Sequence, residues 1–301
     1  MSGPANVGLY GKVASQPDFF RVGAGSFSQA GLDRWLQEGV EALRTERAQW
    51  PATPTAFLLA PPGPTAFIGT LAASVDAAGR SFPLALFREL DAVEAREALP
   101  ALPGMFAGFL RDATSVLSSG PSFDGDTIAR QAQAVMLEAT AQAEPYAWKN
   151  EPVGGLEEVL DGGSRPAVAY ALRTLVTACD RAAASAATAA NALTVDAPVN
   201  GPATSALWLE IARSRLGWGD AVPSLLWTAG PQARLLITLG PPCPQALSFL
   251  ANAQHRSSRF WPLRTKVASA VDQAWAALTG PQRATVEDPG ARFGDLAAAF
   301  G

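Results

Sequence analysis

Three short apolar runs lie close together in the first third of the chain, each bounded by proline, glycine or polar residues. They span residues 56–60, 65–72 and 82–87. Only Pro61-Pro62-Gly63-Pro64, a typical turn sequence, separates the first run from the second. Parallel strands need a crossover of a dozen or more residues, so the runs are expected to form antiparallel strands. Pro83 is compatible with a strand only near its end or at an edge.

Helical periodicity fills much of the remaining sequence. Apolar residues recur three and four positions apart from Leu32 to Leu43, behind Ser28 as the expected helix N-cap. Two alanine-rich stretches, residues 167–192 and 203–216, are expected to be helical because alanine has the highest helix propensity. Further strands are expected at 7–13, 224–228 and 234–239, and further helices within 90–144, 245–253 and 267–278.

The order of these segments predicts the class of fold. Strand pairs followed by blocks of helices favour a mixed or antiparallel sheet covered by helices. The alanine-rich helices then lie in the C-terminal half as additional elements. Residues 145–166 are rich in glycine and proline, so we expect a helical insertion over 145–205. The last stretch, 280–301, is expected to be a loosely ordered tail.

Charge and rare residues exclude several functions. The 23 basic and 27 acidic residues give a net charge of −4, which argues against nucleic acid as a partner. One histidine, His255, and two distant cysteines, Cys179 and Cys243, form no known zinc motif or disulfide framework. We therefore expect no metal and no cofactor, a packing role for Cys179, and an exposed Cys243. Residues 1–11 lack the pattern of a secretory signal, and no run of about 18 apolar residues predicts membrane insertion. A cytoplasmic protein is expected.

Signatures of catalysis are incomplete. Gly11-Lys12 resembles the end of a phosphate-binding loop, but Asn6 stands at its first glycine position and Val13 at its Ser/Thr position. His255 is the one candidate imidazole base, and no GxSxG nucleophile elbow accompanies it. One hypothesis that stays open is therefore a small-molecule hydrolase or ligand-binding enzyme that uses His255. It predicts a pocket lined by His255 and an acid.

A polar connection between the second and third strands has an unusual composition. In residues 74–84, Asp76 and Arg80 are close enough in sequence to form an ion pair across a turn. Gly79 allows a backbone angle that other residues resist, and Pro83 stiffens the exit. The residues predict a rigid hairpin tip braced by an ion pair, with no chemistry of its own.

This connection also carries a family resemblance. Ser74-Val75-Asp76, Gly79-Arg80 and Phe82-Pro83-Leu84 resemble the signature of the TagF (also called ImpM) family, which is associated with the type VI secretion system. Gly8-Leu9-Tyr10-Gly11-Lys12, Asp18-Phe19 and the helix from Trp35 to Gly39 are similar to the opening of that family. Residues 205–262 resemble its closing part loosely. Pro17 departs from the pattern, because a glycine usually precedes Asp18 there.

The resemblance implies a single TagF-like domain over 1–301 with an α/β fold. Its sheet would be central, mixed and largely antiparallel, with helices on both faces in three layers. It also implies a cytoplasmic, non-enzymatic accessory regulator, a post-translational repressor of type VI secretion. The implied partner is the forkhead-associated scaffold protein of that system. The sequence leaves the oligomeric state open.

We expect partners to bind a surface formed by the Asp18-Phe19 turn and the tip from Ser74 to Arg80, with Trp227 as a further member. Phe19 would be an apolar anchor, Asp76 and Arg80 an ordered ion pair, and Gly79 the bend, because a few aromatic and arginine side chains dominate many interfaces. The alternatives are that these residues only stabilise the fold, or that the alanine-rich helices carry self-association.

Overall fold

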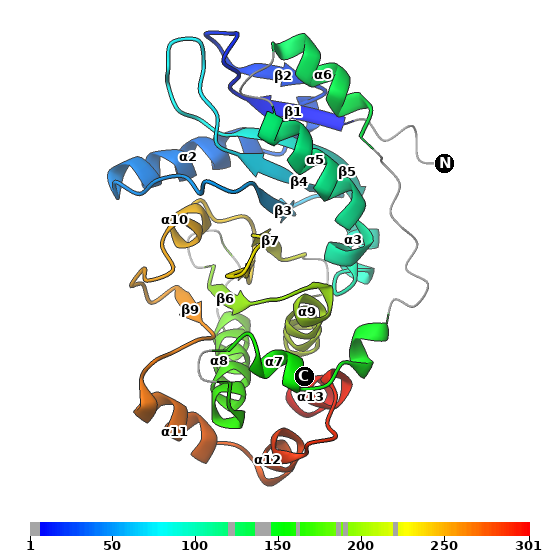
Figure 1. Ribbon diagram of the computed structural model, residues 1–301, viewed down its shortest axis with the longest axis vertical. Helices are drawn as coiled ribbons and strands as arrows, with labels where there is room; N and C mark the ends of the chain where they lie inside the picture. Colours follow the sequence, from blue (N-terminus) through cyan, green and yellow to red (C-terminus); the bar gives the residue numbers. More distant parts are fainter. Residues whose placement is uncertain are drawn as a thin grey trace.

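The computed structural model of the protein describes residues 7–119, 124–135, 146–160, 163–184, 188, 192–218 and 222–301. Parts of the expected helices therefore lie outside the described residues: 120–123, 136–144 and, apart from 188, 185–191. Within the described residues, a nine-stranded sheet runs through the molecule (Figure 1). Its strands are β1 Val7–Gly11, β2 Phe20–Val22, β3 Thr55–Leu59, β4 Thr65–Ala72, β5 Leu84–Asp91, β6 Thr194–Pro198, β7 Ser224–Trp227, β8 Arg234–Thr238 and β9 Phe260–Pro262.

The strand order is β2-β1-β5-β4-β3-β7-β8-β6-β9. Every pair is antiparallel except β6 with β9, which is parallel. The expected hairpins are confirmed, since β3 pairs with β4 and β4 with β5 in register along their lengths. Both edge strands, β2 and β9, are only three residues long.

Three helices cover one face of the sheet. They are α1 Gly25–Gln29, α2 Leu32–Thr45 and α10 Ala246–Ala251. Alternate strand residues such as Phe57, Phe67 and Phe87 point to this side and form a core with Phe27 of α1 and Leu36 of α2.

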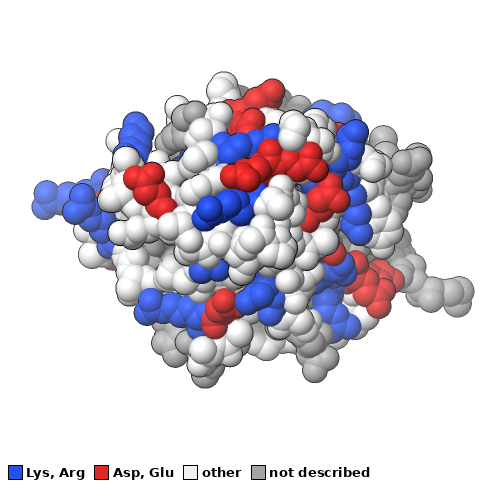
Figure 2. All heavy atoms as spheres, turned by 90° about the horizontal axis from the view of Figure 1, so that it is seen from below, with Lys and Arg blue, Asp and Glu red and all other residues white. Residues whose placement is uncertain are grey.

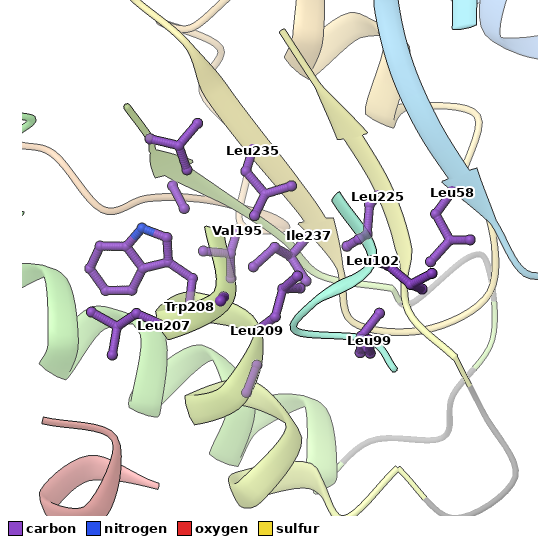
Figure 3. Packing of buried hydrophobic residues seen from close by; sticks show 14 of the residues in the cluster. Leu58, Leu99, Leu102, Val195, Leu207, Trp208, Leu209, Leu225, Leu235 and Ile237 are labelled. Carbon is purple, nitrogen blue, oxygen red and sulfur yellow. The ribbon is translucent and has the colours of Figure 1, made fainter. Parts of the chain in front are cut away.

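The remaining helices belong with the core of the opposite face. Strand residues one position out of phase, such as Leu58, Ile68 and Leu86, are buried there. Figure 3 labels Leu225 and Ile237 on the strands and Leu209 on α9, all of which belong to this core. The elements are α3 Ala92–Glu97, α4 Leu102–Met105, α5 Ala107–Ser119, α6 Gly125–Gln133, η2 Ala147–Asn150, α7 Gly154–Glu157, α8 Arg165–Ala183, α9 Pro202–Leu216, α11 Ala268–Ala276, α12 Gly280–Glu287 and α13 Phe293–Phe300.

The three-layer α/β fold expected from the sequence is therefore confirmed: a mixed, largely antiparallel sheet with helices on both faces. The alanine-rich helices α8 and α9 contact each other, and small side chains allow this close approach. Among the described residues, no helix is both long and apolar enough to cross a bilayer.

Several local expectations were wrong. Ser28 lies inside α1, and α2 is instead preceded by Gly31 in the left-handed region, with φ 73°. Residues 280–301 are not a loose tail, because Phe293 and Phe300 of α13 are fully buried and α12 begins with a capping box. The stretch 145–205 is not purely helical, because β6 within it pairs with β8 and β9 inside the sheet.

A buried ion pair fixes this part of the sheet to α10. Nε and Nη2 of Arg234 on β8 donate to the two carboxylate oxygens of Asp196 on β6, at 2.9 and 3.0 Å. The same guanidinium donates to the carbonyls of Phe249 and Leu250, at the C-terminal end of α10, at 2.9 Å each. Because these carbonyls lack helical partners, Arg234 connects the sheet to the helix end.

We expect Arg234→Met to lower the free energy of unfolding by about 3–5 kcal/mol, since it leaves the Asp196 carboxylate buried without its cation. The double variant Arg234→Met/Asp196→Leu should be less destabilised than the single variant, because no unpaired charge is left. Chemical denaturation measures both. A double variant that is no more stable than Arg234→Met would contradict this account.

Candidate functional site

The β4–β5 loop, residues 73–83, is organised around the carboxylate of Asp76. Oδ1 of Asp76 accepts from the backbone N–H groups of Ala78 and Arg80, at 2.9 and 2.8 Å. Oδ2 accepts from Nε of Arg80 at 2.7 Å and from Nζ of Lys12. The predicted Asp76–Arg80 ion pair is therefore confirmed, and Lys12 at the end of β1 is an additional member.

The loop turns at Gly79, whose φ of +77° lies in the left-handed region that favours glycine. The backbone N–H of Gly79 donates to the carbonyl of Asp76 at 2.9 Å, and that of Asp76 to the carbonyl of Arg80 at 3.1 Å. Ser74 Oγ donates to the carbonyl of Lys12 at 2.7 Å. The expected rigid tip is thus a closed turn joined to β1.

The loop also holds the neighbouring turn before β2. The backbone N–H of Ala77 donates to the carbonyl of Gln16 at 3.0 Å. Nη2 of Arg80 donates to the carbonyl of Pro17. Residues 12–17 and the loop at 74–82, which are distant in sequence, are therefore joined by hydrogen bonds.

The electrostatics of Asp76 follow from these contacts. Its side chain is fully buried, and burial by itself disfavours the charged form. The hydrogen bonds from Lys12, from the backbone and guanidinium of Arg80, and from Ala78 outweigh that cost. They hold the pKa of Asp76 well below its usual range. The carboxylate is therefore ionised throughout the physiological range and unsuited to proton transfer.

Aromatic rings line the side of the loop that faces α2. Phe19 stacks on Tyr10 with ring centroids 5.5 Å apart and meets Phe82 edge-on at 4.9 Å. Nζ of Lys12 lies 5.5 Å from the centroid of Phe19. Burial raises the pKa of Tyr10, which also accepts a hydrogen bond from Gln37 of α2. Phe19 is half-buried, so it presents only part of its ring to solvent.

The structure places most, but not all, of the predicted surface together. Phe19, Ser74, Asp76, Gly79 and Arg80 lie on the loop or against it. Asp18 is exposed on the same turn as Phe19. Trp227 on β7 is different: it is half-buried against the core on the opposite face of the sheet from Phe82. The prediction that Trp227 belongs to this surface is therefore corrected.

Lys12 is the residue that sequence reasoning left out of the site. The sequence relates Lys12 to the end of a phosphate-binding loop and to the opening of the TagF family, but does not predict its contact with Asp76. The informative signal is a lysine that directly follows a strand whose last four residues are all buried, because a lysine at such a position needs an anion nearby.

His255 occupies a packed position. Its ring meets Phe249 edge-on at 4.9 Å, and its Nε2 lies 3.5 Å from Oε1 of Glu46, just after α2. An acid is therefore near, as the enzyme hypothesis requires. Both cysteines are buried and unpaired. Burial raises the pKa of Cys179 to about 12 and also raises that of Cys243, so neither is a thiolate at neutral pH. The expected exposure of Cys243 was wrong.

No group of three or more potential metal ligands from histidine, cysteine, aspartate and glutamate occurs within the described ranges.

Replacing Asp76 by Asn should destabilise the protein in a pH-dependent way. Because the pKa of Asp76 is lower in the folded than in the unfolded chain, its stabilising effect is full above about pH 4 and is lost as pH falls below that value. The difference in unfolding free energy between wild type and Asp76→Asn should therefore be constant near neutral pH and shrink in acid. Asp18→Asn, at an exposed carboxylate nearby, is the control and should change little. If the difference in unfolding free energy between wild type and Asp76→Asn grew in acid, the lowered pKa of Asp76 would be refuted.

Gly79→Ala should cost about 1–2 kcal/mol of stability through its left-handed backbone alone. A Cβ at this position meets no atom within 4 Å, so no steric clash contributes. Gly280→Ala is the matched control, since a Cβ there also meets no atom and its φ is not positive. Thermal unfolding of both variants measures the difference, and equal melting temperatures would disprove backbone strain as the cause.

One solved structure is similar to the chain in fold. The crystal structure of PA0076 from Pseudomonas aeruginosa PAO1 is similar to the chain, with a TM-score of 0.50 and 21% sequence identity, covering 84% of this chain and 96% of that one. At this identity the likeness concerns the fold alone. Among curated proteins, none matches the sequence.

A family model gives the more specific result. Residues 8–138 match the TagF N-terminal domain, described as type VI secretion system-associated. This range contains β1 apart from Val7, the strands β2 to β5, the β4–β5 loop, Lys12 and Phe19. The resemblance found in the sequence is confirmed over this range: residues 8–138 are a TagF N-terminal domain, described as type VI secretion system-associated.

Proposed function

We propose that the chain is a non-enzymatic accessory regulator of type VI secretion system assembly, and specifically a post-translational repressor. It acts in the cytoplasm by protein–protein contact, and its partner is the forkhead-associated scaffold protein of that system. The observation that carries this proposal is the match of residues 8–138 to the TagF N-terminal domain, because that range contains every member of the Phe19 and β4–β5 loop surface.

The geometry of that surface supports a binding role. Arg80 has a side chain that is 58% exposed, yet two contacts fix its guanidinium, to Asp76 and to Pro17. Phe19 is held between Tyr10 and Phe82. Side chains that are already ordered lose little conformational entropy when a partner binds. Arginine and aromatic residues are also the side chains that most often dominate the binding energy of an interface.

The charge balance of the chain supports a protein partner rather than a nucleic acid. On the end of the molecule drawn in Figure 2, basic and acidic side chains are interleaved. Binding to nucleic acid needs a surplus of positive charge on one face. The whole chain instead has a net charge of −4.

The decisive experiment measures regulation and binding together in a bacterium that carries this gene and a type VI secretion system. Deletion of the gene should raise secretion, and the wild-type chain should restore repression. Phe19→Ala and Arg80→Ala should each weaken binding to the purified forkhead-associated protein by about 1–3 kcal/mol and restore less repression. Arg111→Ala is the control, since Arg111 on α5 is 77% exposed and pairs only with Asp112 among its described neighbours.

Outcomes that contradict the proposal are equally clear. Folded Phe19→Ala/Arg80→Ala protein that binds the scaffold protein like wild type would refute this surface. A variant His255→Gln that folds normally but loses repression would instead favour the enzyme hypothesis, because that substitution removes its one imidazole base.

A further inference from the structure

A pocket of about 530 Å³ opens between the β4–β5 loop and α2. Phe19 and Phe82 line it on the apolar side, and Lys12, Arg80 and Arg44 contribute cationic groups. We propose that this pocket receives the carboxylate of an aspartate or glutamate from an acidic segment of a protein partner. The inference rests on the proposed function and names the chemistry that the surface recognises.

Arg80 supplies the principal donors. An arginine carries five N–H groups in a planar fork that matches a carboxylate. Nε of Arg80 donates to Asp76, and one Nη2–H donates to the carbonyl of Pro17. Among the described residues, the other N–H groups of this guanidinium have no hydrogen-bond acceptor. Because the two existing contacts fix its plane, these donors are held in place before a ligand arrives.

Arg44 lies on the opposite side of the same pocket. Its Nη2 donates to the carbonyl of Ser81 at 3.0 Å, which joins the last turn of α2 to the loop. Its side chain is 57% exposed, and its Nη1 lies 3.5 Å from a carboxylate oxygen of Glu41. Arg44 therefore keeps donors directed to solvent beside the loop that holds Arg80.

The buried end of the pocket adds positive charge. Lys12 has a side chain that is only 10% exposed, and its one anionic neighbour in the described chain is Asp76. Asp76 is shared with Arg80. Two cations against one carboxylate leave a net positive charge at this end, in a partly buried place where electrostatic attraction is weakly screened.

Glu38 and Glu41 of α2 also line the pocket and set its selectivity. Glu38 has no fixed partner among the described residues, so a cationic ligand that bound to it would have to order its side chain at a cost in entropy. An anionic ligand avoids this cost because the Arg80 donors are already ordered. Around the pocket as a whole, the charges of Lys12, Arg44 and Arg80 are balanced by those of Glu38, Glu41 and Asp76, so a phosphate dianion meets no surplus of positive charge over what a carboxylate monoanion meets. These contrasts favour a carboxylate. The rings of Phe19 and Phe82 then suit the methylene stem of the ligand and an adjacent apolar side chain.

The test uses the full chain and blocked dipeptides as probes. Acetyl-Phe-Glu-amide should shift the NMR signal of the Arg80 Nε–H group saturably, with a dissociation constant in the millimolar range. Acetyl-Phe-Gln-amide, which has the same shape without the charge, should bind about tenfold more weakly. Acetyl-Phe-Lys-amide should bind more weakly than the glutamate peptide.

Variants assign the binding to this pocket. In the variants, binding is followed by the backbone N–H signal of Gly79, which all of them retain. Arg80→Gln and Arg44→Gln should each weaken binding of the glutamate peptide about tenfold, because each removes a charge-assisted hydrogen bond. Arg111→Gln, the same change on α5, should bind like wild type. Glu38→Gln should strengthen binding a few-fold, since it removes a repulsive charge from the pocket. Thermal unfolding of each variant checks that the chain still folds.

Tighter binding of the lysine peptide, weaker binding to Glu38→Gln, or no saturable shift up to about 100 mM peptide would overturn the inference. If the glutamate peptide does not bind but Phe19→Ala and Arg80→Ala still relieve repression, the proposed function stands and the carboxylate site does not. If the peptide binds as expected but these variants repress like wild type, the carboxylate site is supported and its proposed role in secretion fails.

Discussion

The carboxylate of Asp76 is the group on which the shape of the candidate surface depends. It is buried, and it is satisfied by four donors from the end of β1 and from its own loop. A buried charge is tolerated only when it is paired and hydrogen-bonded. The need to satisfy this one anion therefore determines where Lys12 and Arg80 lie, and Arg80 in turn holds the turn at Pro17. The surface has its shape because protein groups, in place of water, donate hydrogen bonds to Asp76.

The fold joins the family-matched part of the chain to the remainder through the sheet. Residues 8–138 contribute β1 apart from Val7 and the strands β2 to β5, and β6 to β9 come from later in the sequence. The two sets meet where β3 pairs with β7, with Phe57 opposite Leu226 and Leu58 opposite Leu225. Each of the two hydrophobic cores contains residues from both sides of this strand pairing. The later strands and helices therefore bury apolar surface of β3 and β4 that would otherwise be exposed.

Local patterns predicted much of the fold, and long-range contacts explain what they missed. The strands at 56–60 and 65–72 were predictable because apolar runs and a proline-rich turn are properties of neighbouring residues. The strand β6 was not, since Thr194–Pro198 contains a proline and the aspartate that Arg234 neutralises from β8. The C-terminal helix α13 was missed for a similar reason. Its short alanine-rich sequence becomes stable because Phe293 and Phe300 reach a core built from other segments.

The same distinction holds for the site. The Asp76–Arg80 pair and the bend at Gly79 could be predicted because they lie within five residues of one another. The contact of Lys12 with Asp76 and the position of Trp227 on the opposite face of the sheet both depend on strand register. The local sequence does not specify that register.

The sheet ends at both sides in strands of three residues, and β9 ends in Pro262, which has no N–H to donate. Such short edge strands have too few unpaired backbone groups to form a stable ladder with an extended peptide. These edges therefore protect the protein from non-specific edge-to-edge strand pairing with other molecules. Selective contacts with other proteins must then reside in side chains, where a single substitution can change them.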